Sequence, residues 1–153
     1  MDSFRRRLSL ALGGGPGGDP ALLHPLVLAY VGDTVFDLAV RTLLIDTHDA
    51  KAHALHLMSA RRVCAKAQAV AAQGLYEELT ETEQAVFRRG RNTKPATIPK
   101  HATLEDYCAA SGLEAVVGYL YLSGQEERLL QVLARALELE QVRDIVRPKP
   151  FKG

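Results

Sequence analysis

The 153-residue sequence has no tryptophan, only two cysteines and few aromatic residues of any kind. No apolar run approaches the roughly 20 residues needed to span a bilayer, so an integral membrane protein is not expected. Cys64 and Cys108 are isolated from each other, unlike the dense cysteine framework of a small secreted domain. Each lies among small or apolar residues, and we therefore expect two reduced core thiols in a cytoplasmic protein.

Neither sign of charge is in excess, because 19 Lys and Arg residues accompany 18 Asp and Glu residues for a formal net charge of +1. Net charge therefore does not mark a nucleic-acid binder, and any basic surface must arise from clustering. Apolar residues make up 47% of the chain and charged residues 24%, as in ordinary globular proteins. This length is sufficient for one domain with a substantial core.

Glycine is concentrated near the start, where residues 13–18 read Gly-Gly-Gly-Pro-Gly-Gly. Because such a stretch has high chain entropy and nothing to bury, residues 1–19 are predicted to be a disordered segment. Residues 20–142 are predicted to form the folded domain. Residues 143–153, which contain Pro148 and Pro150, are predicted to be a flexible tail.

Helical spacing dominates the apolar pattern between these ends. Apolar residues recur from Pro25 to about Ile45 in a way that predicts one long, largely buried helix. Capping residues and glycine stops predict further helices over residues 49–58, 59–73, 80–89, 103–123 and 125–142. We find no convincing strand and no internal repeat, so the predicted fold is all-α.

Two of the apolar helices carry an acidic residue in an unfavourable place. Asp33 lies in the run Ala29–Asp37, and Asp37 follows four residues later on the same helical face. Glu114 lies in the second apolar helix. Packing of the two helices would bring Asp33 and Glu114 together as oxygen ligands suited to Mg²⁺ or Mn²⁺, with Asp37 as a helper. The alternative is that each acid forms a structural ion pair with Arg or Lys.

Glycine interrupts these same two helices at Gly32, Gly112 and Gly118. Each costs about 1 kcal/mol of helix stability relative to alanine. Glycines kept at that cost often allow two helices, or a helix and a ligand, to approach closely.

Basic residues cluster in one segment, which we call the basic segment (residues 88–101). Cations mixed with Asn and Thr, in a loop predicted over residues 90–102, are suited to phosphate contacts that carry little sequence information. Few aromatic residues accompany them, which favours a duplex over a single strand. Its candidate contacts are Arg88, Arg89, Arg91, Asn92, Lys94 and Lys100, and a second basic face is predicted from Arg61, Arg62, Lys66 and Gln68. The alternative is an ordinary solvated loop.

Three motifs in order resemble a known family. The run Tyr30-Val31-Gly32-Asp33-Thr34-Val35-Phe36 resembles the nuclease signature of ribonuclease III, and residues 113–122 resemble its second acidic helix. Together with Arg88-Arg89-Gly90-Arg91-Asn92, Lys94 and Pro99-Lys100, they resemble Mini-III ribonucleases, the branch without a double-stranded-RNA-binding domain. The resemblance covers about residues 22–138.

The resemblance implies an all-helical homodimer that cleaves double-stranded RNA with Mg²⁺ and matures large-subunit (23S) ribosomal RNA. It implies that Asp33 and Glu114 are catalytic, metal-binding acids. The chain departs from full-length ribonuclease III at Leu26, Ala29 and Ser111, where that family carries further acids. Fewer acids imply more water ligands or recruitment of Asp37, and leave the number of metals open. The alternative functions are a catalytically silent module of this fold that binds structured or ribosomal RNA, and a helical interaction bundle without an RNA role.

Overall fold

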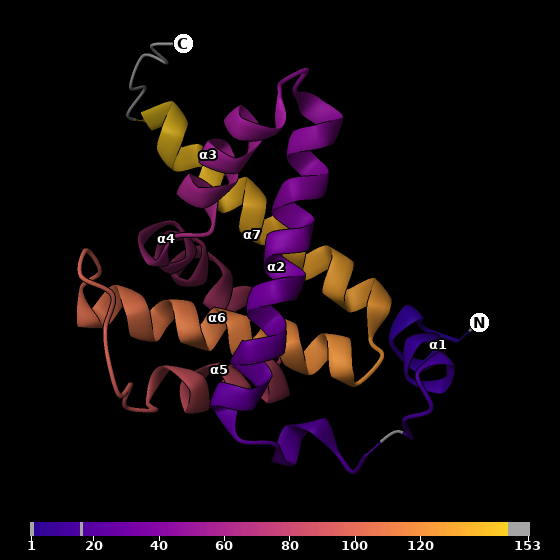
Figure 1. Ribbon diagram of the computed structural model, residues 1–153. Coiled ribbons are helices and arrows are strands. Elements are labelled where there is room, and N and C mark those ends of the chain that lie inside the picture. Colours follow the sequence, from indigo (N-terminus) through magenta and orange to yellow (C-terminus); the bar gives the residue numbers. More distant parts are fainter. Residues whose placement is uncertain (1, 16, 147–153) are drawn as a thin grey trace.

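The structure is a computed structural model that describes residues 2–15 and 17–146, with side chains as far as Glu140. It is all-helical, as predicted, and no strand occurs in the described ranges. Figure 1 shows helices joined by loops, with α1 beside the turn between α6 and α7. In chain order they are α1 (Phe4–Ala11), the 3₁₀ turn η1 (Pro20–Leu22), α2 (Pro25–Thr47), α3 (Ala52–Arg62), α4 (Ala65–Leu75), the 3₁₀ turn η2 (Tyr76–Glu78), α5 (Glu81–Arg91), α6 (Leu104–Leu122) and α7 (Glu126–Val146).

The two acid-bearing helices, α2 and α6, cross in direct backbone contact (Figure 1). A Cβ added to Gly32 would lie 1.7 Å from the carbonyl oxygen of Glu114. A Cβ added to Gly118 would lie 1.9 Å from the carbonyl oxygen of Leu28. The predicted close approach is therefore present, and only glycine permits it because any side chain would overlap the facing backbone.

A second glycine contact joins α5 to α6. A Cβ on Gly90 would lie 2.9 Å from Cβ of Ala115, and a Cβ on Gly112 would lie 2.9 Å from the carbonyl oxygen of Phe87. Gly90 is thus a buried residue of α5. The expected start of the loop at residue 90 was wrong, because α5 continues to Arg91 and the chain leaves the helix at Asn92.

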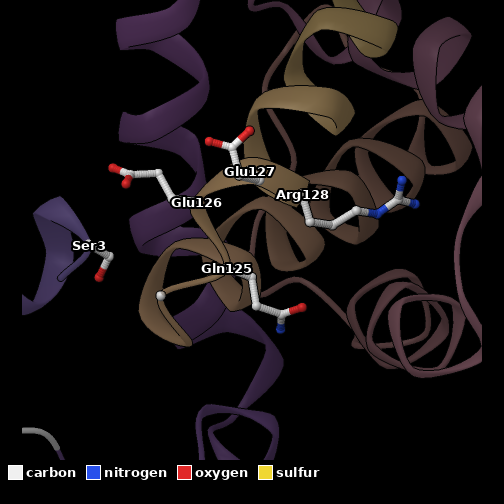
Figure 2. Close-up of a pocket in the computed structure, with 6 residues that line it drawn as sticks. Ser3, Gln125, Glu126, Glu127 and Arg128 are labelled. Atoms are coloured by element: carbon white, nitrogen blue, oxygen red, sulfur yellow. The ribbon is translucent and has the colours of Figure 1, made fainter. Parts of the chain in front are cut away.

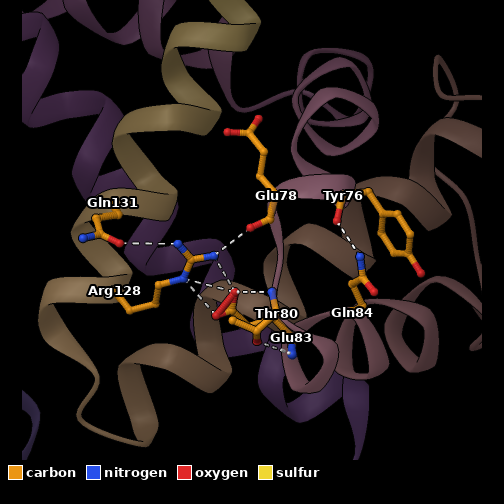
Figure 3. Close-up of polar contacts among 7 residues, drawn as sticks. All are labelled: Tyr76, Glu78, Thr80, Glu83, Gln84, Arg128 and Gln131. Atoms are coloured by element: carbon orange, nitrogen blue, oxygen red, sulfur yellow. Dashed lines mark hydrogen bonds and ion pairs between the residues drawn. The ribbon is translucent and has the colours of Figure 1, made fainter.

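An ion-pair network ties the start of α7 to α5 and η2 (Figure 3). Nη2 of Arg128 lies 2.7 Å from Oε1 of Glu83, whose side chain is 3% exposed. Burial alone would raise the pKa of Glu83, but hydrogen bonds from Arg128 and Thr80 outweigh it and lower the pKa. Thr80 and Glu83 also form a capping box at the start of α5, so the carboxylate of Glu83 both caps α5 and binds the start of α7.

Several expectations for the remaining chain were wrong. Residues 4–11 form α1 instead of a disordered stretch, because Ser3 caps the helix and the Phe4 N–H donates to Oε1 of Glu126 at 3.4 Å. Ser59 does not start a helix but is buried within α3. Cys64 is exposed at the start of α4 instead of lying in the core.

The C-terminal helix extends beyond its expected end. It continues to Val146, so residues 143–146 of the predicted tail are helical, and the rest of that tail lies outside the described residues. Within the described part of the chain, no helix is long and apolar enough to cross a membrane.

Replacing Gly32 with Ala should destabilise the fold by about 3 kcal/mol or more, because the new methyl group overlaps the backbone of α6 and neither backbone can yield cheaply. Urea unfolding measures the change. Gly15→Ala is the matched control, since a Cβ on Gly15 meets nothing within 4 Å. Equal stability of the two variants would contradict the backbone contact.

Candidate active site

The crossing of α2 and α6 places Asp33 and Glu114 within electrostatic reach of each other. Gly32 contacts the backbone of Glu114, and Asp33 is the next residue of α2. Asp33 lies on the exposed side of its helix, whereas Glu114 is half-buried between α2 and its neighbours. The juxtaposition predicted from the sequence is therefore present, and we call it the Asp33–Glu114 pair.

The pair is electrostatically unfavourable without a cation. Burial, and then the charge of Asp33, raise the pKa of Glu114 to about 8, against a weaker opposing effect of Gln68. Burial and then the charge of Asp37 raise the pKa of Asp33 as well. No basic side chain is among the causes of either shift. The alternative of two structural ion pairs is therefore not what the described residues show.

Asp37 has a partner of its own. Its Oδ2 lies 3.0 Å from Nε of Arg41, one turn along α2. A cation bound by Asp33 would have to compete with Arg41 for this carboxylate. Asp37 therefore affects the Asp33–Glu114 pair through its negative charge, which raises the pKa of Asp33.

The donor set fits a hard divalent cation that keeps several waters. Carboxylate oxygens are the ligands that Mg²⁺ prefers, and Mg²⁺ is commonly held by one or two carboxylates with water completing the shell. No group of three or more His, Cys, Asp or Glu side chains suited to a metal occurs within residues 2–15 and 17–140. A cation at the Asp33–Glu114 pair would relieve the repulsion that raises the pKa of Glu114.

Most cations of the basic segment are exposed at the end of α5 and in the loop that follows. Lys94 and Lys100 lie in that loop, and Arg88 donates to the Tyr76 hydroxyl at 2.8 Å. The guanidinium of Arg91 lies 5.9 Å from the ring centroid of Phe87 and donates to Oδ1 of Asn92. On the second face, Lys66 and Arg61 are exposed at the start of α4 and the end of α3.

Two of the predicted RNA contacts have guanidinium groups that are bound by other parts of the protein. Arg89 donates to the carbonyl oxygens of Ala21 at 2.5 Å and Leu23 at 3.0 Å, which fixes η1 against the end of α5. Nε of Arg62 lies 3.2 Å from Oε2 of Glu140, and its side chain is only 12% exposed. Gln68, which we expected on the same basic face, is 1% exposed, so that expectation was wrong.

The hollow in Figure 2 lies elsewhere. It has a volume of about 500 Å³ between the start of α1 and the turn from α6 to α7. Ser3 and residues 124–128 line it, and none of them belongs to the Asp33–Glu114 pair or the basic segment. We therefore place the candidate active site on the crossing of α2 and α6.

Comparisons with known proteins show the family of this chain. Residues 26–125 match the family described as Ribonuclease III domain, and they include both acids of the pair. The chain is 46% identical over 120 residues to a Mini-ribonuclease 3 of Symbiobacterium thermophilum, covering 78% of this chain and 92% of that protein. It is 41% identical over 120 residues to a Mini-ribonuclease 3 of Staphylococcus aureus, covering 77% and 90%.

A solved structure gives the same result for the fold. The crystal structure of a protein from Fusobacterium nucleatum superposes with a TM-score of 0.69 at 26% sequence identity. The match covers 76% of this chain and 93% of that chain. The resemblance identified from three motifs therefore extends to most of the folded part.

Stability should depend on pH through Glu114. Its pKa is about 8 in the fold against 4.5 as the ordinary value, so the folded state holds a proton that the unfolded state has lost between these pH values. Stability from this group is full below pH 4.5 and is lost as pH rises towards 8, at a slope of up to about 1.4 kcal/mol per pH unit.

Urea unfolding in EDTA from pH 5 to 9 measures this loss. Glu114→Gln should remove it, so the stability of the wild type relative to this variant should fall as pH rises. A difference that stays constant over this range would show that Glu114 titrates normally.

Proposed function

This chain belongs to the ribonuclease III family, and we propose that it is a Mg²⁺-dependent endoribonuclease that cleaves double-stranded RNA. The observation that carries the proposal is the Asp33–Glu114 pair, two neighbouring acids whose repulsion no basic side chain relieves. A silent RNA-binding module would have no need for such an arrangement. We therefore favour cleavage over binding alone.

Asp33 and Glu114 would hold the cation through their carboxylate oxygens. The cation would supply Lewis-acid stabilisation of charge on the scissile phosphate and make water a better nucleophile. Asp33, on the exposed side of α2, faces the substrate side, while Glu114 anchors from within. The close crossing of α2 and α6 fixes the spacing of the two carboxylates before RNA arrives, so little ordering remains at the moment of reaction.

The exposed cations are proposed to bind the phosphates of the RNA duplex. These are Arg88, Arg91, Lys94 and Lys100 with Asn92 from the basic segment, and Arg61 and Lys66 from the second face. Arg62 and Arg89 are left out because Glu140 and the carbonyls of residues 21 and 23 hold their guanidinium groups. Phosphate contacts of this kind give affinity without sequence selectivity.

An exposed apolar face on η1 and α2 supports a homodimer. Leu22 is 82% exposed and Tyr30 is 79% exposed, and the residues between them on this face are Leu23, Leu26 and Val27. A contiguous apolar patch of this kind marks a protein interface. Two copies meeting here in two-fold symmetry would present two active sites, one for each strand of a duplex.

The biological substrate proposed is a precursor of large-subunit (23S) ribosomal RNA in the cytoplasm. Proteins named Mini-ribonuclease 3 match most of this chain, and the chain covers most of their length. Processing assays with precursor RNA carrying a paired stem would test this role, and a precursor left intact under conditions that cleave other duplexes would contradict it.

Asp33→Asn should reduce cleavage of a long RNA duplex by at least about 100-fold, since the several kcal/mol that a held cation supplies are lost. Duplex affinity measured in EDTA should be unchanged. Asp46→Asn is the matched control, because Asp46 is exposed on the same helix outside the pair. Cleavage by the wild type must require Mg²⁺ and stop in EDTA. Full activity of Asp33→Asn would end the metal assignment.

Replacing both Lys94 and Lys100 with Ala should weaken duplex binding. The slope of log affinity against log salt concentration should become less steep by about 1 for each phosphate that the variant no longer neutralises. Filter binding across a salt series measures the slope. Lys51→Ala, an exposed lysine at the start of α3, should leave the slope unchanged. An unaltered slope in the double variant would remove these lysines from the RNA surface.

Tyr30→Lys should convert a dimer into monomers, because it would bury a charge in the apolar face. Sedimentation velocity measures the mass. Leu57→Lys, at another exposed apolar residue, should remain dimeric. A wild type that sediments as a monomer at micromolar concentration would refute the dimer itself.

A further inference from the structure

Gln68 is an unusual residue in this fold. It lies on α4 among buried alanines, with a side chain that is 1% exposed. Its Nε2 is buried and makes no hydrogen bond of normal geometry with the rest of the described chain. A buried amide without a full partner destabilises a fold, so a purely structural role would be served better by an apolar residue of the same size.

The neighbour of this amide is the carboxyl group of Glu114. The Gln68 side chain, buried between α4 and α6, lies close enough to interact with this carboxyl group. α4 packs against α6, so the amide reaches Glu114 from a different helix than Asp33 does. Glu114 therefore has a like charge from α2 and a buried amide from α4 as neighbours.

The helix that carries Glu114 has no second acid close to it. Ser111, one turn before Glu114 on α6, is buried and carries no charge. α6 has no other acid within one turn of Glu114, so an acid that orients this carboxylate would have to come from another helix. Gln68 is the polar side chain of α4 that is placed to orient it.

We propose that Gln68 is a positioning residue that orients the Glu114 carboxylate for a divalent cation, an inference that rests on the proposed function. The amide acts through Glu114 and does not touch the RNA. Outer groups that hold a metal-binding carboxylate commonly change metal affinity 10- to 100-fold when they are removed. The buried amide thus lowers fold stability and raises cation affinity, two effects that a structural role would not combine.

Gln68→Met tests the proposal on the full chain, because methionine keeps the length of the side chain and removes the amide. Calorimetric titration with Mn²⁺ alone should show affinity weakened by about 10-fold or more. Thermal unfolding in EDTA should show an unchanged or raised Tm, and duplex binding in EDTA should be unchanged. Gln73→Met, at an exposed glutamine of the same helix, should match the wild type in every measurement.

The outcomes separate this inference from the proposed function. If Gln68→Met binds Mn²⁺ as tightly as the wild type while Asp33→Asn does not, Gln68 has no positioning role and the active site stands. If the wild type neither binds Mn²⁺ nor cleaves duplex RNA, the proposed function itself fails. A lowered Tm with unchanged Mn²⁺ affinity would show that the amide is merely structural.

A measurement on the wild type keeps the test decisive if the variant does not fold. The side-chain NH₂ resonances of Gln68 and Gln73 can be followed by NMR during titration with Mg²⁺. We expect the Gln68 signals to shift with saturation of the site and those of Gln73 to stay in place. Unmoved Gln68 signals at saturating Mg²⁺ would overturn the proposal.

Discussion

The backbone contact between Gly32 and Gly118 is the constraint on which the rest of this structure depends. Without a side chain at either position, the carbonyl oxygens of Glu114 and Leu28 lie where a Cβ would be. The two helices are therefore closer than side-chain packing would allow. Since Asp33 follows Gly32 directly and Glu114 supplies the contacted carbonyl, the contact that sets the fold also sets the spacing of the acids.

Three arginines stabilise the scaffold, whereas Lys94 and Lys100 are exposed. Arg128 is bound to Glu83, Arg62 to Glu140, and Arg89 to the carbonyls ahead of α2. The planar guanidinium suits such fixed, multiple contacts better than an ammonium group. Lys94 and Lys100 sit in the loop after α5, and their compact charges can follow a phosphate backbone without ordering the loop beforehand. The net charge of +1 thus does not show that some cations are bound within the protein while others are exposed.

The sequence predicted the parts of this molecule that are encoded locally. The long helix expected over residues 25–45 runs from Pro25 to Thr47, and glycines in apolar helices correctly indicated the close crossing. The structural role of Arg89 could not be predicted, because its acceptors lie 66 and 68 residues away in the chain. A sequence does not show which backbone carbonyls a side chain will reach. Gln68 was misplaced for a related reason. A polar residue beside Arg61, Arg62 and Lys66 looks exposed until the packing of α4 against α6 and α7 shows which face is buried.

A sparse acidic site is a physically coherent solution here. Each further carboxylate near Glu114 would add repulsion in a half-buried place, where its pKa already lies near 8. A neutral amide can orient Glu114 without adding charge. Because an amide, unlike another acid, holds no proton that must leave, fewer protons are displaced when a cation binds. With two acids and one neutral amide, this part of the fold carries less repulsion between like charges than four acids in the same place would.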